Sequence, residues 1–338
     1  MRRQFAMVHK TGKINRTITF NKSGYEPFID FIKAYAILCV LMGHTFPYLK
    51  ASGYSLWYGM QVPLFVLVQV FHVLKKESYS FSVKKMLKRI VCPFLLIQII
   101  PLSIETLKYG YSNNLIANCL IGWGYGPGAY YPWIYVQLAV LILVVKPWFD
   151  RGTKKQNLII SLVICEGLEI ISSIIGLPDS LYRILSIRYL FLIYLGWLWV
   201  KEGIVLNVKT IVLSLMSMGT IIYFDYCYTP TEPWFYDTAW RCHRWPCYFY
   251  VSTLFCGILY LIYNKTKGNS IVRYASKTLA KCSYEIFLIQ MVIIPMMPQL
   301  DYINNKFVSY GFRMILIVII SIVGGYYFNR LYNKMCVL

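Results

Sequence analysis

Long apolar runs, separated by short polar and basic stretches, follow one another along the chain after residue 25. A helix that crosses the ~30 Å hydrocarbon core of a bilayer needs about twenty residues of this kind. Ten runs approach that length, near residues 28–48, 57–74, 90–107, 131–149, 157–176, 181–200, 208–226, 247–263, 279–298 and 312–331. The pattern predicts an all-α fold, a polytopic membrane bundle of about ten transmembrane helices with no soluble catalytic domain.

Composition agrees with this class, since 58% of the 338 residues are hydrophobic and only 14% are charged, whereas soluble domains carry about 25% charged residues. Residues 1–24 are polar and basic without apolar periodicity, which predicts a loosely ordered cytoplasmic tail. Residues 25–334 are expected to form a single membrane-embedded domain. The first apolar run lacks a small-residue cleavage site, so we expect a retained span and no cleaved signal peptide.

The net charge of +20 is informative through its distribution. With the N-terminus in the cytoplasm, the predicted inner segments hold 24 of the 34 Lys and Arg residues, as the positive-inside rule requires. These segments are 1–24, 75–89, 150–156, 201–209, 264–281 and 330–338. Topology and anionic lipid therefore explain the charge, and no nucleic-acid partner is expected. We expect a multi-pass protein of the cell membrane, specifically a bacterial plasma membrane.

Two long loops interrupt the apolar pattern. Residues 108–130 are rich in Gly and Tyr and are expected to re-enter the membrane or cap a cavity, while residues 227–246 combine aromatic side chains with mixed charge. Most of the ten cysteines lie in apolar runs and are expected to be small buried hydrophobes. Cys242 and Cys247 flank the second loop, which leaves a disulfide open as an alternative. The four scattered histidines lack ligand spacing, so no metal site is predicted.

The first apolar run carries three ionisable residues, Asp30, Lys33 and His44. A charge at bilayer depth costs roughly 2.5–3.5 kcal/mol even on the lenient insertion scale, so such residues usually face the bundle interior and have a function. Asp30 and Lys33 are three residues apart and share a helix face. Lys33 and His44 are eleven apart, close to three turns, so they point the same way about 16 Å apart. This spacing suggests a long ligand lying along the helix, with an anionic head at the cation and a reacting end at the imidazole.

The spacing of these three residues also matches a known sequence motif. Asp30-x2-Lys33-x10-His44, within FIDFIKAYAILCVLMGHTF, resembles the opening motif of the acyltransferase-3 family. Further segments are similar to that family in the same order: VPLF at 62–65, KKMLKRIVCPFLL at 84–96, IRYLFLIYLGWLW at 187–199 and SYEIFLIQ at 283–290. Two positions depart from the family pattern, because Lys33 replaces an arginine and Gln290 stands where a histidine is common. Lysine keeps the charge but loses the bidentate fork.

The resemblance implies a membrane O-acyltransferase of commonly ten helices. Such enzymes move an acyl group, usually acetyl, onto sugars of envelope or extracellular polysaccharides. The implied partners are acyl-CoA as co-substrate, with acetyl-CoA expected, a carbohydrate acceptor and the lipid bilayer, and no bound cofactor is implied. A transporter or flippase for a lipid-linked sugar is the alternative from another class, because intramembrane charges also mark transport pathways. A non-enzymatic scaffold would leave the three charges of the first span unexplained.

Two residues are predicted as catalytic and two as donor-binding. His44 would act as general base or acyl carrier, and Asp30 would orient Lys33. Lys33 would bind donor phosphates, with Arg188, placed in the inner half of the sixth span, as a second contact. The structural alternatives are an interfacial histidine, an ion pair of Asp30 with Lys33, and Arg188 paired with Glu202 or Glu169.

Four residues are predicted to bind the acceptor. Tyr131 and Trp133, beside Tyr130 at the entry to the fourth span, would form a stacking wall for a sugar; the alternative is an interfacial aromatic belt. Arg241 and His243 lie in the second long loop and would contact the acceptor from outside, unless that loop is simply solvated.

Overall fold

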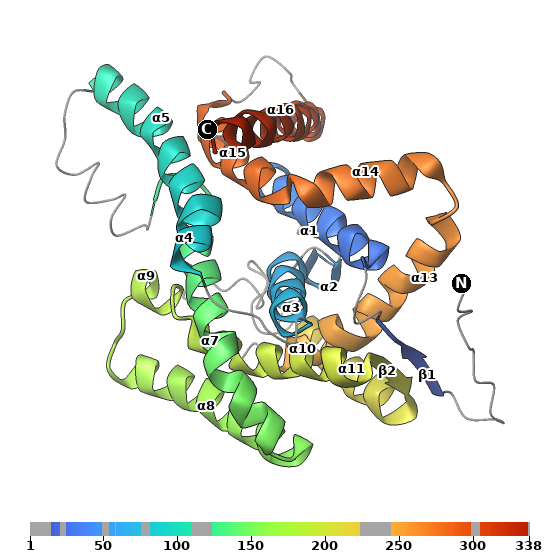
Figure 1. The fold of residues 1–338 in the computed structure, drawn as a ribbon. Coiled ribbons are helices and arrows are strands. Elements are labelled where there is room, and N and C mark those ends of the chain that lie inside the picture. Colours follow the sequence, from blue (N-terminus) through green and yellow to red (C-terminus); the bar gives the residue numbers. More distant parts are fainter. Residues whose placement is uncertain are drawn as a thin grey trace.

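The computed structural model describes residues 15–20, 25–48, 54–57, 59–75, 82–109, 124–223, 245–298 and 305–336. Helices account for most of these residues, and a single two-stranded sheet lies at one side of the described part (Figure 1). The predicted all-α membrane class is confirmed by this architecture.

Six helical segments of the described chain are long and apolar enough to cross a membrane. They are α1 (Pro27–Thr45), Val83–Lys108, α7 (Tyr131–Arg151), α8 (Lys154–Ile174), Cys247–Thr266 and α16 (Lys306–Met335). The second comprises α4 (Val83–Met86), the π-helical turn η2 (Leu87–Val91) and most of α5 (Cys92–Tyr109). The fifth includes most of α12 (Trp245–Phe249), all of η6 (Tyr250–Phe255) and α13 (Cys256–Thr266).

The predicted count of about ten crossings is not confirmed. A seventh crossing is obtained if α14 (Ser270–Lys281) and α15 (Ser283–Met296), bent by 70°, are counted together. The remaining predicted spans correspond to α3 (Gln61–Leu74), α10 (Leu190–Glu202) and α11 (Val208–Tyr223), with 14, 13 and 16 residues. At about 1.5 Å per residue these are shorter than the hydrocarbon core. Short helical elements complete the list: α2 (Tyr54–Trp57), α9 (Asp179–Tyr182) and the 3₁₀ turn η3 (Ser186–Tyr189).

The N-terminal region contains a strand, so the prediction of a loosely ordered tail is wrong for this part. β1 (Asn15–Ile18) pairs antiparallel with β2 (Ile204–Asn207) between α10 and α11. The chain then continues to Phe20, whose ring contacts those of Phe71 at 5.0 Å and Trp199 at 5.9 Å. Four residues are too few to show a strand period, and the pairing partner lies far away in sequence. The local sequence pattern therefore could not predict this strand.

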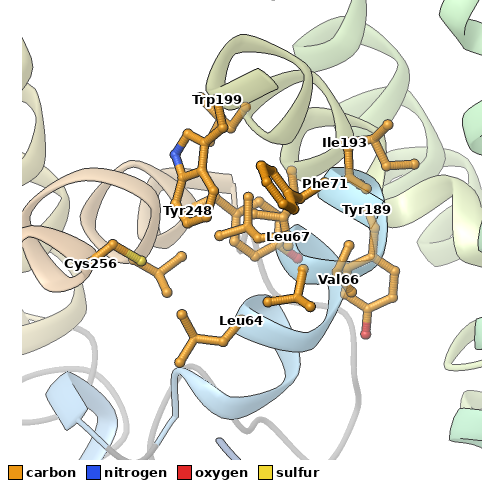
Figure 2. Close-up of a cluster of buried hydrophobic side chains, with 14 of the residues drawn as sticks. Leu64, Val66, Leu67, Phe71, Tyr189, Ile193, Trp199, Tyr248 and Cys256 are labelled. Carbon is orange, nitrogen blue, oxygen red and sulfur yellow. The ribbon is translucent and has the colours of Figure 1, made fainter. Parts of the chain in front are cut away.

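The larger of two main hydrophobic clusters surrounds α3. Figure 2 shows Leu64, Val66, Leu67 and Phe71 of this helix among side chains of η3, α10, α12 and α13. The partners labelled there are Tyr189, Ile193, Trp199, Tyr248 and Cys256. α3 is thus enclosed by protein, which explains why it is apolar around its whole circumference.

Close approach of α10 to α3 depends on a glycine. A Cβ placed on Gly196 would lie 2.7 Å from a methyl carbon of Val70. Gly196 belongs to the segment 187–199 that carries part of the family resemblance, so its role in this chain is helix packing.

The second cluster joins α1 to α5 and α15. It contains Ile37, Val40 and Leu41 of α1, packed with Phe94 of α5 and Met291 of α15 among other residues. Phe65 and Tyr131 contact both clusters. The two clusters therefore meet along α1 and the start of α7, and the candidate site lies on this side of α1.

Candidate active site

α1 carries three of the predicted site residues on one uninterrupted helix. Pro27 occupies the first turn, where its missing N–H and fixed φ cost nothing. No proline or π-helical turn interrupts the helix before Thr45. Helix geometry then places Lys33 and His44 on one stripe, about 16 Å apart along the axis.

The stripe between the cation and the imidazole faces the protein interior. Ile37 and Val40 lie on it, Leu41 lies beside it, and all three are buried in the second cluster. Lys33 is half-buried at one end, and His44 is exposed at the other. The apolar middle of this face is therefore packed against α5 and α15, and Lys33 and His44 lie at its two ends.

At the beginning of α1, Asp30 accepts a short hydrogen bond from the hydroxyl of Tyr25. Loss of hydration and the negative charge of Asp30 raise the pKa of Tyr25 above its ordinary value, so this hydroxyl stays protonated and donates. The charges of Asp30 and Arg89 both act on Lys33. Arg89 belongs to η2, so a second helix brings a cation to the same place.

Glu285 of α15 extends this group. Arg89 and Lys281 act electrostatically on its carboxylate, which also hydrogen-bonds to Asn329 of α16. The hydroxyl of Tyr284 donates to the carbonyl of Ile90 at 2.7 Å and holds α15 against η2. We call Tyr25, Asp30, Lys33, Arg89 and Glu285 the inner cluster, and the face of the bundle where it lies the inner face. Its cations come from two helices and are suited to binding an anionic group.

The structure separates Asp30 from His44. Fourteen residues of continuous helix put them about 21 Å apart, so Asp30 cannot touch a group that reacts at His44. Its contact is Tyr25, and its charge acts on Lys33. Any contribution of Asp30 therefore passes through the inner cluster, consistent with the predicted orientation of Lys33.

Near the other end of α1, aromatic residues gather where α16 begins. The ring of Phe46 lies 5.2 Å from that of Phe307, and Tyr48 lies 5.5 Å from Phe307 and 5.9 Å from Tyr310. His44 thus lies two residues before an aromatic patch formed by two helix ends. Rings of this kind provide flat surfaces on which a sugar can stack.

Tyr131 and Trp133 at the start of α7 point into the protein. The Tyr131 ring lies 5.8 Å from Phe287 and 6.2 Å from Phe65, and Trp133 lies 5.8 Å from Phe94. Both side chains are half-buried against the second cluster. The structure therefore joins these two predicted residues to the inward face of α1.

The Gly-rich segment before α7 is inserted between α5 and α15. Gly124, Gly126 and Gly128 have positive φ angles of 131°, 90° and 84°. Gln98 of α5 bonds to both the N–H and the carbonyl of Tyr125, and Gln290 of α15 donates to the carbonyl of Pro127 at 3.2 Å. Gln290, at the position where the family often has histidine, is fully buried and holds this segment.

Arg188 does not belong to the inner cluster, and its predicted placement in the inner half of the sixth span is wrong. Arg188 lies in η3, just before α10 begins. The other end of α10 is at Glu202, which pairs with Lys154 near the β1–β2 sheet. Fourteen residues of largely helical chain put Arg188 about 20 Å from Glu202. The error came from the direction of α10, which runs toward the inner face.

Arg188 is instead buried among aromatic rings. Its guanidinium lies 4.9 Å from the ring centre of Tyr189 and 5.5 Å from that of Tyr182, and it donates to the Tyr189 hydroxyl at 3.0 Å. Tyr182 in turn bonds to Glu169. Arg188 therefore lies near Glu169, one of its predicted structural partners, through Tyr182, and donor binding by Arg188 stays a prediction.

Several predicted residues cannot be placed. Arg241 and His243 lie outside the described residues, as does Cys242, so the disulfide stays a prediction. Cys247 is fully buried in α12. His72 is exposed near the end of α3, next to Phe71, which contacts Phe20. In the described part of the chain, no three His, Cys, Asp or Glu side chains are grouped as metal ligands.

Comparison with known proteins decides the family. The family model described as "Acyltransferase domain" matches residues 26–330, nearly the whole chain. The chain belongs to the acyltransferase-3 family. No curated protein and no solved structure matched in the same comparisons.

The match begins at the N-cap of α1 and ends within the last turns of α16, so it includes both ends of the α1 stripe. The protein is a membrane acyltransferase, which has an acyl donor, an acceptor and a bilayer as its partners.

Sequence reasoning missed Arg89 and Glu285. Both lie in segments that resemble the family, but only tertiary packing brings Arg89 close to Lys33 and Glu285 close to Arg89.

Proposed function

We propose that this acyltransferase moves an acetyl group from acetyl-CoA to a hydroxyl of an envelope or extracellular polysaccharide sugar, with His44 as general base. The observation that carries the proposal is the inward stripe of α1, with Lys33 in a charged cluster at one end and His44 at the other. The choice of acetyl and of a polysaccharide follows the family resemblance.

The donor binds from the cytoplasm at the inner cluster. Lys33 and Arg89 supply cations from two helices, and charge-assisted hydrogen bonds to phosphate are about twice as strong as neutral ones. Asp30, held by Tyr25, fixes the side chain of Lys33. From there the extended arm of the donor runs along α1 toward the outer half. The packed side chains of the second cluster move aside to admit it.

At the outer end, His44 takes the proton of the acceptor hydroxyl as its oxygen bonds to the thioester carbonyl carbon. The tetrahedral intermediate then loses sulfur: the carbon–sulfur bond breaks, and the imidazolium returns the proton to the leaving thiolate. The products are the sugar ester and CoA thiol. The half-buried rings of Tyr131 and Trp133, and the aromatic patch beside His44, favour a flat, partly apolar acceptor such as a sugar ring.

The test measures free thiol released from acetyl-CoA by purified protein in detergent, with and without polysaccharide. Wild type should release thiol in the presence of acceptor, and His44→Ala should lower kcat by about 10²-fold or more. His72→Ala, which changes a histidine at the end of α3, is the matched control and should behave like wild type. Equal release by His44→Ala and wild type would exclude His44 as the base.

Mass spectrometry distinguishes the class of reaction. Glycans from cells with the gene should be heavier by one acetyl group per modified sugar than those from cells without it. An acyl group found on His44 of the protein itself would replace the general-base step by an acyl-carrier step. Unchanged glycans together with no thiol release would reject the proposed function.

A further inference from the structure

α14 carries a basic residue at every fourth position, Arg273, Lys277 and Lys281. It follows the span Cys247–Thr266 after a three-residue turn and is capped by Asn269, whose side chain accepts from two backbone N–H groups. At Cys282 the chain bends by 70° into α15. If α15 alone crosses the membrane, a helix bent by 70° from it would lie close to the membrane plane. Figure 1 shows α14 lying across α1 between α13 and α15.

The inward face of α14 is small and apolar. Ala280 is buried, and Leu279 packs against the second cluster. At the edge of this face, the amine of the exposed Lys277 lies 6.0 Å from the ring centre of Tyr25, and the exposed Lys281 acts on Glu285. These contacts place α14 at the inner face, beside the inner cluster.

The remaining faces of α14 are exposed in two different ways. Ile271 and Tyr274, three residues apart, are 76% and 72% exposed and form an apolar strip. Arg273, Lys277 and Lys281 recur every four residues and form an exposed cationic strip next to it. An in-plane helix with one apolar and one basic strip inserts the first among acyl chains and extends the second to headgroups.

We infer that α14 is a binding site for acidic phospholipid in the inner leaflet. Ile271 and Tyr274 are buried among the acyl chains at the membrane surface, and Arg273, Lys277 and Lys281 bind the phosphate groups of anionic headgroups. Charge complementarity selects this occupant, since three cations in a row attract anionic headgroups much more strongly than zwitterionic ones. The inference is independent of the acyl donor and acceptor.

Native mass spectrometry of the delipidated full-length protein tests the inference. The protein is titrated in detergent with phosphatidylglycerol or with phosphatidylcholine of the same chain length. Wild type should retain the acidic lipid preferentially. Each basic residue near an anionic surface strengthens binding about fivefold, so Arg273→Gln/Lys277→Gln/Lys281→Gln should lower the preference at least about tenfold.

Two controls separate recognition from net charge and from misfolding. Lys155→Gln/Lys209→Gln/Lys334→Gln removes the same number of exposed charges from three different helices and should keep most of the preference. Arg273→Lys/Lys277→Arg/Lys281→Arg keeps the cationic strip and should bind like wild type. Equal retention of both lipids by wild type, or an equal loss in the two glutamine variants, would overturn the inference. Neither result depends on enzymatic activity, so the proposed function is tested separately.

Discussion

Gly126 lies where only glycine fits. Its φ of 90° is in the left-handed region, and a Cβ placed on it would lie 2.2 Å from the carbonyl oxygen of Met291. Both the backbone angle and the contact would have to change on substitution. Gly126→Ala should therefore lower the free energy of unfolding by at least about 2 kcal/mol. Thermal unfolding in detergent, followed by tryptophan fluorescence, measures the change.

Gly167 provides the matched control. It lies within α8, and a Cβ there would meet no atom within 4 Å. Gly167→Ala should leave the stability unchanged or raise it by up to about 1 kcal/mol, since alanine is the better helix former. Equal melting temperatures for both variants would contradict the description of the Gly-rich segment as rigidly inserted.

Lys33 offers a second prediction for single residues. If its charge binds donor phosphate, Lys33→Ala should raise KM for acetyl-CoA about tenfold or more while lowering kcat less. Lys33→Arg keeps the charge and should remain close to wild type. Steady-state thiol release at varied donor concentration gives both constants. An unchanged KM in Lys33→Ala would limit this residue to a structural ion pair with Asp30.

Single residues also show what the sequence could reveal. Lys33 and His44 were recognisable because their spacing and their cost in a membrane can be read within one helix. Arg89 was not, because its proximity to Lys33 depends on how η2 packs against α1. Arg188 looked similar to Lys33, as a cation in an apolar run, yet its burial among Tyr182 and Tyr189 results from tertiary structure.

Among the elements, β1 ties the start of the chain to the bundle. Phe20, just after this strand, contacts rings from α1, α3 and α10, and Ile18 is buried. Phe20→Ala should destabilise the protein by about 2–3 kcal/mol, because three aromatic contacts are lost and a void remains. Arg16→Gln changes an exposed residue of the same strand and should be neutral. Melting curves of both variants measure this, and a neutral Phe20→Ala would show that the strand is only loosely held.

Apolar runs predicted the helices well but not all of their lengths. Each of the ten runs has a helical counterpart, yet α3 and α10 are shorter than a crossing because they are enclosed by protein. Hydropathy reports burial from water and does not distinguish lipid from a protein core. The strand β1 and the bend at Cys282 were missed because each depends on contacts distant in sequence.

For the whole molecule, the basic segment with Lys88 and Arg89 lies beside both the C-terminal segment and the start of α1. Lys88 donates to the carbonyl of Cys336 near the C-terminus, and Arg89 acts on Lys33 near the start of α1. The positive-inside rule predicts that the inner face is cytoplasmic. A fluorescent protein fused after residue 338 should therefore be fluorescent in bacterial cells, and alkaline phosphatase fused after Pro178 should be active. An active phosphatase at the C-terminus would reverse the orientation and, with it, the side from which the donor enters.

The distance between two residues of a continuous α-helix is set by their separation in sequence, because the rise per residue is nearly constant. In the proposed mechanism, α1 carries the cation of Lys33 and the imidazole of His44 on one helix, which would fix the distance that the donor has to span. A donor with a shorter pantetheine arm would bind at Lys33, but its thioester would not reach His44. A bulkier or longer acyl chain would extend past the imidazole. If the donor binds as proposed, its length would be selected by the fixed length of this helix, without dedicated recognition of the acyl group.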